Sequence, residues 1–324
     1  MIGNSTMPIL EELDLDSVQP GEKKRIWVQL ASNGIGWPIC APVIIAKGRQ
    51  PGPVLGLTAV VHGNELNGIP VIQRLFNEIE VENLQGTIVG VLAANVPGLL
   101  LAQRRFNDDV DPNHVFPGEP DGNNSQIYVY RLLNRIVNRF EYLIDLHTAS
   151  FGRVNSYYIR ADMEHPVTRK MAELQNAAII VHNPPQDGTL RGTAEDLGIH
   201  AITLEVGDPH RFQKGMIRSG LTGIHNTLID LGMTQGEIEI PEEGDQTVLC
   251  ASSYWIYTKK GGLLEVTPQI TDFVKKGQRV GILRNIFGDV INEYVAPEDG
   301  IVIGKSVNPV NQSGGRILHL GIVK

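Results

Sequence analysis

The chain reads VLGLTAVVHGNE over residues 54–65, an almost unbroken apolar run that stops at a histidine. Such a run predicts a strand covered on both faces, as in a parallel sheet flanked by helices. Residues 51–53 read Pro-Gly-Pro and break the chain just before it, and the pattern after it predicts a helix over residues 65–79. The sequence therefore places His62 and Glu65 where a buried strand gives way to a helix.

Strands and helices alternate on both sides of this stretch. We expect further strands at residues 25–30, 38–46, 87–93, 142–147, 178–182 and 199–206, and helices at 125–140, 165–177 and 216–231. The alternation predicts an α/β fold with a largely parallel or mixed sheet. Its active site should lie at the C-terminal ends of the strands. The first 20 or so residues show little periodicity, so order is expected to begin near Lys24.

The pattern changes after the helix expected at residues 216–231. Residues 237–245 are acidic and contain proline, which predicts a domain boundary. Residues 248–324 combine short alternating strands with Gly and Pro turns. We therefore expect a catalytic domain over residues 1–236 and a small all-β domain over residues 237–324.

Composition limits the classes of partner. The 324 residues carry a net charge of -8 with scattered lysines and arginines, which argues against nucleic-acid or anionic-membrane binding and favours a small-molecule or peptide substrate. Cys40 and Cys250 are too far apart to indicate a cysteine zinc site or a disulfide framework. No apolar run approaches the roughly 20 residues of a membrane helix, and no secretory signal pattern is present. We expect a cytoplasmic protein, and the sequence leaves a homo-oligomer open.

His62 and Glu65 are three residues apart across a glycine turn, so their side chains can face one point. Imidazole nitrogen and carboxylate oxygen both bind zinc, and a catalytic site combines three protein ligands with an open position for water. The spacing alone is weak, because short motifs also occur by chance. His147 strengthens it, since this residue ends the apolar strand expected at residues 142–147 and is the natural third ligand.

Two more carboxylates belong to this pattern. Asp145 shares a strand face with His147, where it either accepts the distal N–H of a ligating imidazole or is an ordinary buried, hydrogen-bonded aspartate. Glu205 ends the strand expected at residues 199–206, and a carboxylate buried there is costly unless it is paired or functional. Desolvation would raise its pKa toward that of a general base for a metal-bound water. The alternative for Glu205 is a structural ion pair.

Three motifs, in this order, resemble one known family. They are HGNE at residues 62–65, DLHT at 145–148 and LEVG at 204–207, accompanied by PGP at 51–53, NxPG at 95–98 and FPG at 116–118. Together they are similar to the succinylglutamate desuccinylase and aspartoacylase family, distant relatives of the zinc carboxypeptidases. The similarity is spread over the first two thirds of the chain.

The resemblance implies a zinc-dependent deacylase that hydrolyses an amide. The implied fold is a three-layer, carboxypeptidase-like α/β domain with a mixed, largely parallel sheet, followed by a small C-terminal all-β domain that shapes the channel. The matching positions make His62, Glu65 and His147 the ligands of one Zn²⁺ per chain and Glu205 the base. Arg105 matches the family arginine that polarises the scissile carbonyl.

Residues 111–114 depart from the family pattern. The family commonly reads Asp-Leu-Asn-Arg where this chain reads Asp-Pro-Asn-His, so a histidine replaces the arginine that would bind a substrate carboxylate bidentately. Asn113 is retained and can still form a hydrogen bond with the substrate. His114 either binds a neutral or different substrate group or is an ordinary loop residue. The sequence therefore leaves open whether the substrate needs a free carboxylate.

We predict a zinc-dependent hydrolase that cleaves the amide bond of an N-acylated amino acid or related small molecule, with water activated by Glu205. One alternative is a carboxypeptidase-like peptidase for short or modified peptides. Another is a zinc-binding protein that has lost catalysis, although Glu205 and Arg105 argue against it because zinc storage needs neither a base nor an electrophile. A site of two histidines and one glutamate is also compatible with other divalent ions.

Overall fold

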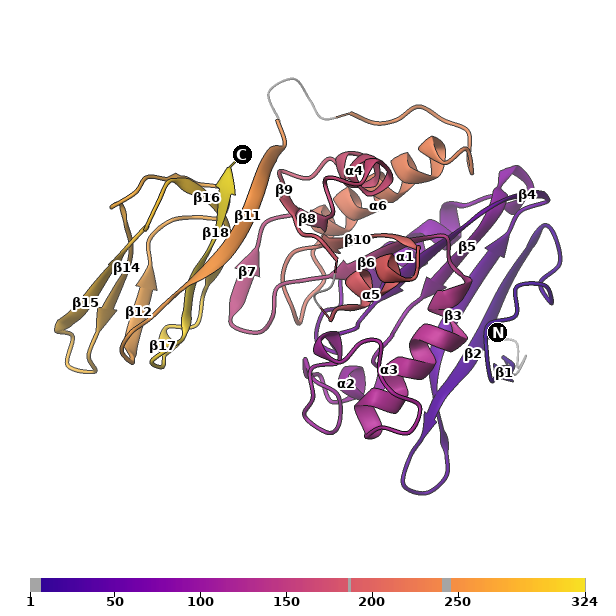
Figure 1. The fold of residues 1–324 in the computed structure, drawn as a ribbon, viewed down its shortest axis with the longest axis horizontal. Coiled ribbons are helices and arrows are strands. Elements are labelled where there is room, and N and C mark those ends of the chain that lie inside the picture. Colours follow the sequence, from indigo (N-terminus) through magenta and orange to yellow (C-terminus); the bar gives the residue numbers. More distant parts are fainter. Residues whose placement is uncertain (1–6, 186–187, 241–245, 324) are drawn as a thin grey trace.

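A mixed sheet of 14 strands runs through the part of the chain that this computed structural model describes, residues 7–185, 188–240 and 246–323 (Figure 1). In spatial order its strands are β1 (Ile9–Leu10), β2 (Glu22–Ser32), β3 (Pro38–Lys47), β5 (Gln85–Val91), β4 (Gln50–Ala59), β6 (Tyr142–His147), β10 (His200–Glu205), β8 (Tyr158–Ala161), β9 (Ile179–His182), β11 (Val248–Tyr257), β18 (Arg316–Val323), β16 (Gly300–Ser306) and β13 (Phe273–Val274), with β7 (Arg153–Asn155) paired to β16.

The centre of the sheet, β5-β4-β6-β10, is parallel. Most of its apolar side chains are buried, as expected for strands with helices on both faces. The strand predicted over residues 142–147 is confirmed with those bounds as β6, and β10 is one residue shorter than predicted at each end. β4 ends at Ala59, because Val60 has a left-handed φ of 61° that turns the chain toward His62.

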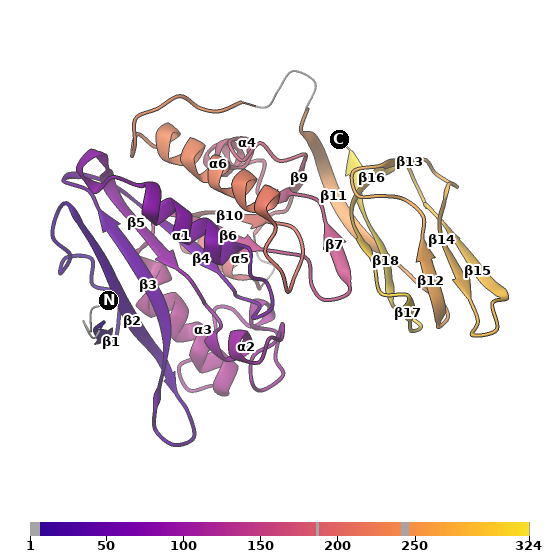
Figure 2. The same ribbon diagram turned by 180° about the vertical axis from the view of Figure 1, so that it is seen from behind.

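Helices cover both faces of this sheet (Figures 1 and 2). One hydrophobic core includes Ile202 and a second includes its neighbour Ala201, and successive strand residues point to opposite faces. The first core contains α1 (Gly68–Glu78), α4 (Pro166–Glu173) and α6 (Lys214–Asp230), and the second contains α3 (Asn124–Arg135) and α5 (Leu190–Asp196). The remaining helices are α2 (Val96–Leu100) and the 3₁₀ turns η1 (Val81–Asn83), η2 (Pro112–His114) and η3 (Val137–Arg139). The predicted three-layer α/β architecture is confirmed.

α1 begins three residues later than predicted, at Gly68. A Cβ atom on Gly68 would lie 2.7 Å from the Cβ of Ala59 and 2.9 Å from that of Leu146, so glycine lets α1 start in close contact with β4 and β6. The residues between β4 and α1 are thereby left as a loop that carries His62 and Glu65. None of the helices in the described part of the chain combines the length and apolar character that a membrane crossing requires.

The N-terminal segment is ordered earlier than predicted. β1 pairs in parallel with β2, Ile9 opposite Trp27. Leu13 and Val18 are buried in the second core, each 1% exposed. The expectation that order begins near Lys24 is therefore wrong, because apolar residues spaced too irregularly to form a periodic pattern still pack against the sheet.

The C-terminal region consists of strands, as predicted: every element assigned within residues 246–323 is one. Four of them continue the large sheet, since β11 pairs in parallel with β9. A second sheet contains β15 (Val290–Val295), β14 (Arg279–Arg284), β12 (Gly262–Val266) and β17 (Val310–Asn311), and the two share a small core. The boundary predicted at residues 237–245 falls partly on residues 241–245, outside the described residues.

Candidate active site

His62 and Glu65 lie in the loop between β4 and α1, and His147 ends β6. One ligand atom from each lies within 4.8 Å of the other two. His62 Nδ1 is 3.2 Å from His147 Nδ1 and 2.9 Å from Glu65 Oε1, and His147 Nδ1 is 3.0 Å from Glu65 Oε2. All three side chains are buried. The structure brings together the three residues predicted as metal ligands.

Each imidazole is held at its far nitrogen by a carboxylate. His62 Nε2 lies 3.1 Å from Asp111 Oδ1, and His147 Nε2 lies 2.7 Å from Asp145 Oδ2. Because a carboxylate accepts, each Nε2 donates, and a neutral imidazole then turns a lone pair toward the centre at Nδ1. Zinc–nitrogen distances of ~2.0–2.1 Å place two tetrahedral ligand atoms about 3.3 Å apart, close to the 3.2 Å between the Nδ1 atoms. The three residues fit a zinc ion.

The centre favours positive charge. Burial opposes ionisation of Glu65, but the neighbouring imidazoles of His62 and His147 hold the pKa of its carboxyl well below the usual range. Burial also opposes the charged form of His147, yet Asp145 and Glu65 outweigh it and raise the pKa of His147 well above its ordinary value. Surroundings that stabilise a proton on His147 also stabilise a metal cation, because the same carboxylates interact with both.

Glu205 ends β10 and pairs with His147 across the parallel register of β10 and β6. Tyr158 Oη donates to Glu205 Oε1 over 3.2 Å, and Asn155 Nδ2 donates to Oε2 over 3.2 Å. Burial, followed by the negative charge of Glu65, raises the pKa of Glu205 above its ordinary value. A raised pKa brings a carboxylate closer to the value that suits a general base at neutral pH, so its surroundings suit the predicted role.

Arg104 and Arg105 point to different places. Arg105 Nη1 lies 2.9 Å from Asp109 Oδ2 with its side chain 54% exposed, outside the pocket that holds the metal ligands. Arg104 lines that pocket, where its Nη1 donates to Glu65 Oε1 over 3.0 Å and its Nε donates to Asp111 Oδ2 over 2.8 Å. In this structure Arg104, held by the carboxylates Glu65 and Asp111, lines the pocket in place of Arg105, and a catalytic role for Arg105 stays a prediction.

Asn113 and His114 lie in η2 and both line the pocket. The side-chain oxygen of Asn113 accepts a hydrogen bond from Leu190 N over 2.8 Å, which ties η2 to the start of α5. His114 is 71% exposed, and its Nε2 lies 3.8 Å from Asp111 Oδ2. Both side chains are within the pocket, and a role in substrate binding stays a prediction. Asp111, which the sequence did not single out, holds His62 and Arg104 together.

The pocket has a volume of about 330 Å³ and includes side chains that sequence reasoning missed. Among them are Arg153, Asn155, Tyr158, Arg160, Arg191, Trp255, Arg316 and His319. The spacing of Arg153, Asn155, Trp255, Arg316 and His319 along the chain does not predict that they meet, because the pairing of β7 with β16 and of β11 with β18 brings them together. Tyr158 and Arg160 lie on β8, and Arg191 lies on α5. Figure 1 shows β7 reaching out to the C-terminal strands. The C-terminal region therefore supplies part of the pocket wall.

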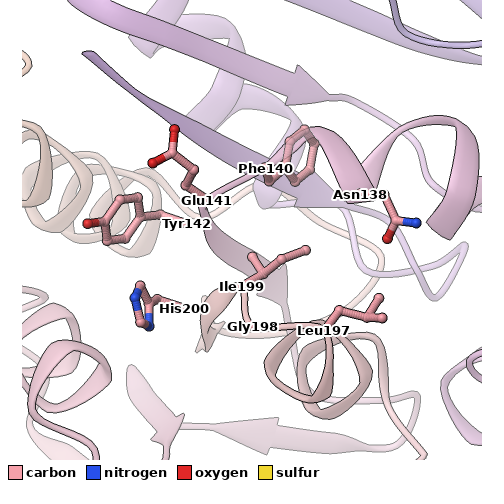
Figure 3. Close-up of a pocket in the computed structure, with 8 residues that line it drawn as sticks. All are labelled: Asn138, Phe140, Glu141, Tyr142, Leu197, Gly198, Ile199 and His200. Atoms are coloured by element: carbon pink, nitrogen blue, oxygen red, sulfur yellow. The ribbon is translucent and has the colours of Figure 1, made fainter.

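A second hollow, of about 470 Å³, lies at the opposite ends of the same strands (Figure 3). Its lining includes Tyr142 and His200, the first residues of β6 and β10, and none of the predicted site residues. In sheets of this kind, ligands bind at the carboxyl ends of the strands. The pocket around His62, Glu65 and His147 is therefore the candidate active site.

Comparisons with known proteins show the family of this chain. A family model described as the succinylglutamate desuccinylase/aspartoacylase catalytic domain matches residues 51–231. N-alpha-acetyl-L-2,4-diaminobutyric acid deacetylase from Halomonas elongata is 24% identical over 91% of this chain and 88% of its own. Succinylglutamate desuccinylase from Pseudomonas aeruginosa is 25% identical over 63% of this chain and 65% of its own.

Solved structures share the fold. A succinylglutamate desuccinylase/aspartoacylase from Rhodobacter sphaeroides superposes with a TM-score of 0.83 at 24% identity, covering 96% of this chain and 98% of that one. The ectoine utilization protein EutE (DoeB) from Ruegeria pomeroyi, in a product-bound structure, gives a TM-score of 0.84 at 20% identity, covering 94% and 96%. At these identities the likeness concerns the fold, and it extends through the C-terminal strands.

Proposed function

Because the chain belongs to the succinylglutamate desuccinylase/aspartoacylase family, we propose that it is a zinc-dependent deacylase that hydrolyses the amide bond of an N-acylated amino acid or a related small molecule. The observation that carries the proposal is the convergence of two imidazole Nδ1 atoms and the Glu65 carboxylate beside the buried Glu205. The Halomonas relative, a deacetylase of an N-acetylated amino acid, supports this substrate class.

His62, Glu65 and His147 would hold the zinc ion. When bound, zinc supplies a Lewis acid for the carbonyl and lowers the pKa of a water molecule. Glu205 would accept a proton from the attacking water and later deliver it to the leaving amine. Arg104 replaces Arg105 in the predicted mechanism: its guanidinium stabilises the negative charge that develops on the carbonyl oxygen.

A base and a cationic group in the same pocket also argue against a zinc-binding protein without catalysis. Glu205 is buried and hydrogen-bonded by Tyr158 and Asn155, so its carboxylate is oriented. Storage of a metal would need neither this base nor Arg104. An oriented base next to a metal centre is what hydrolysis requires.

The test is a hydrolysis assay on N-acetyl and N-succinyl amino acids and on short peptides, with chelator and with zinc added back. We expect release of the free amino acid, loss of activity with chelator, and recovery with zinc. Turnover of peptides alone would replace the proposal with a peptidase, and turnover that resists chelation would overturn the metal assignment. No turnover by the zinc-loaded protein would overturn the deacylase.

A matched pair of histidine variants isolates the metal centre. His147→Ala removes one Nδ1 ligand, so zinc content and activity should both be lost. His225→Ala removes an imidazole that lies on α6 and contacts Glu78, outside the pocket. Zinc retained at wild-type level in His147→Ala would contradict the ligand assignment.

A further inference from the structure

The candidate active site contains an unusual number of cationic side chains. Five arginines line it: Arg104, Arg153, Arg160, Arg191 and Arg316. Three are engaged within the protein. Arg104 bonds Glu65 and Asp111, Arg160 donates to Tyr158 Oη, and Arg191 pairs with Glu195. Among the described residues, the guanidinium groups of Arg153 and Arg316 have neither a carboxylate partner nor a hydrogen bond.

Arg153 and Arg316 meet at one aromatic ring. The Cζ atom of each lies 5.4 Å from the ring centroid of Trp255, and the imidazole of His319 stacks on the same tryptophan at 5.0 Å and 11°. A guanidinium that packs against an aromatic ring keeps its N–H edge available for a planar anion. The half-buried Trp255 thus presents two cations whose hydrogen-bonding edges are unoccupied.

Backbone pairing fixes both arginines. β7 carries Arg153 and pairs with β16, Arg153 opposite Ser306. β18 carries Arg316 and pairs with β11, which holds Trp255. Burial, together with the positive charges of Arg316 and Arg104, lowers the pKa of Arg153 to about 10, so it stays charged at neutral pH. Glu65 and Glu205 offset part of this effect, but neither carboxylate forms an ion pair with Arg153. Two cations held close together in a pocket, without a carboxylate in direct contact, are stabilised by an anionic ligand.

We propose that Arg153 and Arg316, on Trp255, bind the free carboxylate of the substrate and take over the role that His114 does not fill. The proposal rests on the proposed deacylase function and specifies its substrates as N-acylated amino acids with an ionised carboxylate. Bidentate guanidinium–carboxylate pairing supplies both affinity and orientation. It also places substrate recognition on the C-terminal region, whereas the metal ligands and Glu205 belong to the α/β region.

The experiment compares Nα-acetyl-L-2,4-diaminobutyrate with its primary carboxamide as paired substrates. Arg316→Met removes the charge from an exposed side chain and keeps an apolar stem on Trp255. We expect the preference of the enzyme for the free acid over the carboxamide to fall about 10- to 100-fold, mainly through KM, because hydrogen bonds to charged groups are worth about 1.5–3 kcal/mol. Arg316→Lys should restore part of this preference, and Arg153→Met should repeat the loss.

Arg279→Met is the matched control, because Arg279 lies on β14 and pairs with Glu293 on β15, and neither residue lines the pocket. It should keep the wild-type preference. An unchanged preference in both Arg316→Met and Arg153→Met would overturn the proposal.

Measurements of substrate binding test the carboxylate site independently of the proposed deacylase activity. If the wild type turns over neither compound, the proposed function fails, and calorimetric titration of both compounds decides on the carboxylate site. Binding of the free acid that is tighter than binding of the carboxamide, and weakened in Arg316→Met, supports the site. Equal binding of the two compounds by the wild type, or no binding of the free acid, overturns it.

Discussion

Asp145 Oδ2 lies 2.7 Å from His147 Nε2, and its other oxygen accepts a hydrogen bond from Thr58 Oγ1 over 2.6 Å. The carboxylate is fully buried and fixes the ring of a metal ligand. Asp145→Asn removes the charge that holds the proton at Nε2 and keeps the shape. We expect zinc affinity to fall about 10- to 100-fold, as for other partners of ligating histidines. Competition with a chromophoric chelator measures it.

A second aspartate–histidine contact provides the control for this change. Asp162 Oδ1 lies 3.7 Å from His182 Nδ1, and neither residue lines the pocket. Asp162→Asn should leave zinc affinity at the wild-type level. Equal zinc affinities for Asp145→Asn and the wild type would mean that Asp145 is only an ordinary buried aspartate.

Glu205→Gln should separate metal binding from turnover. The amide keeps the volume of the side chain but cannot accept a proton from water, so we expect kcat to fall about 10²- to 10⁴-fold. Zinc content should stay at the wild-type level, because Glu205 is not among the three converging ligands. Elemental analysis and initial rates on the same preparation measure both, with the exposed Glu265→Gln as control. Undiminished turnover would remove Glu205 from the mechanism.

Tyr158→Phe should move the acidic limb of the activity profile to higher pH. Glu205 acts as a base only when ionised, and burial already raises its pKa. The hydrogen bond from Tyr158 Oη favours the ionised carboxylate, so its removal raises that pKa further and the ionised fraction is lost at a higher pH. The kcat/KM of Tyr158→Phe should therefore decline at mildly acidic pH where the wild type is still active.

Tyr157 offers a matched control for this profile. Its hydroxyl is buried and has no hydrogen-bond partner among the described residues, and the side chain does not line the pocket. Tyr157→Phe removes the same atom one position away and should leave the acidic limb in place. Superimposable profiles for all three proteins would show that Tyr158 does not act on the base.

The residues of the candidate metal centre and Glu205 could largely be predicted from the sequence, because they follow buried strands. Apolar runs that stop at His62, His147 and Glu205 predict strand ends, and the carboxyl ends of parallel strands lie at one edge of a sheet. Local signals of this kind also located the long helices within a few residues. The start of α1 at Gly68 could not be predicted from hydrophobic periodicity, because it depends on the close approach of Gly68 to β4 and β6.

The outer part of the pocket was not predictable by these means. β7 is three residues long, and its pairing with β16, more than 100 residues later, sets the place of Arg153. Trp255 and Arg316 enter through the pairing of β11 with β18. Such long-range contacts leave no trace in local spacing. Which of Arg104 and Arg105 enters the pocket likewise depends on the positions of carboxylates in the folded chain, since Arg104 bonds Glu65 and Asp111 whereas Arg105 pairs with Asp109.

The variants Arg104→Met and Arg105→Met test which of these two arginines takes part in catalysis. Arg104 reaches the pocket and bonds Glu65, Asp111 and Ser150, so loss of its guanidinium should lower kcat about 10²- to 10³-fold, the effect of removing one donor to a developing oxyanion. Arg105→Met should stay close to the wild type, because an exposed ion pair contributes at most about 1 kcal/mol. Zinc content, measured alongside, separates loss of catalysis from loss of the metal. The reverse ranking would return the catalytic role to Arg105 and would require its side chain to leave Asp109 when substrate binds.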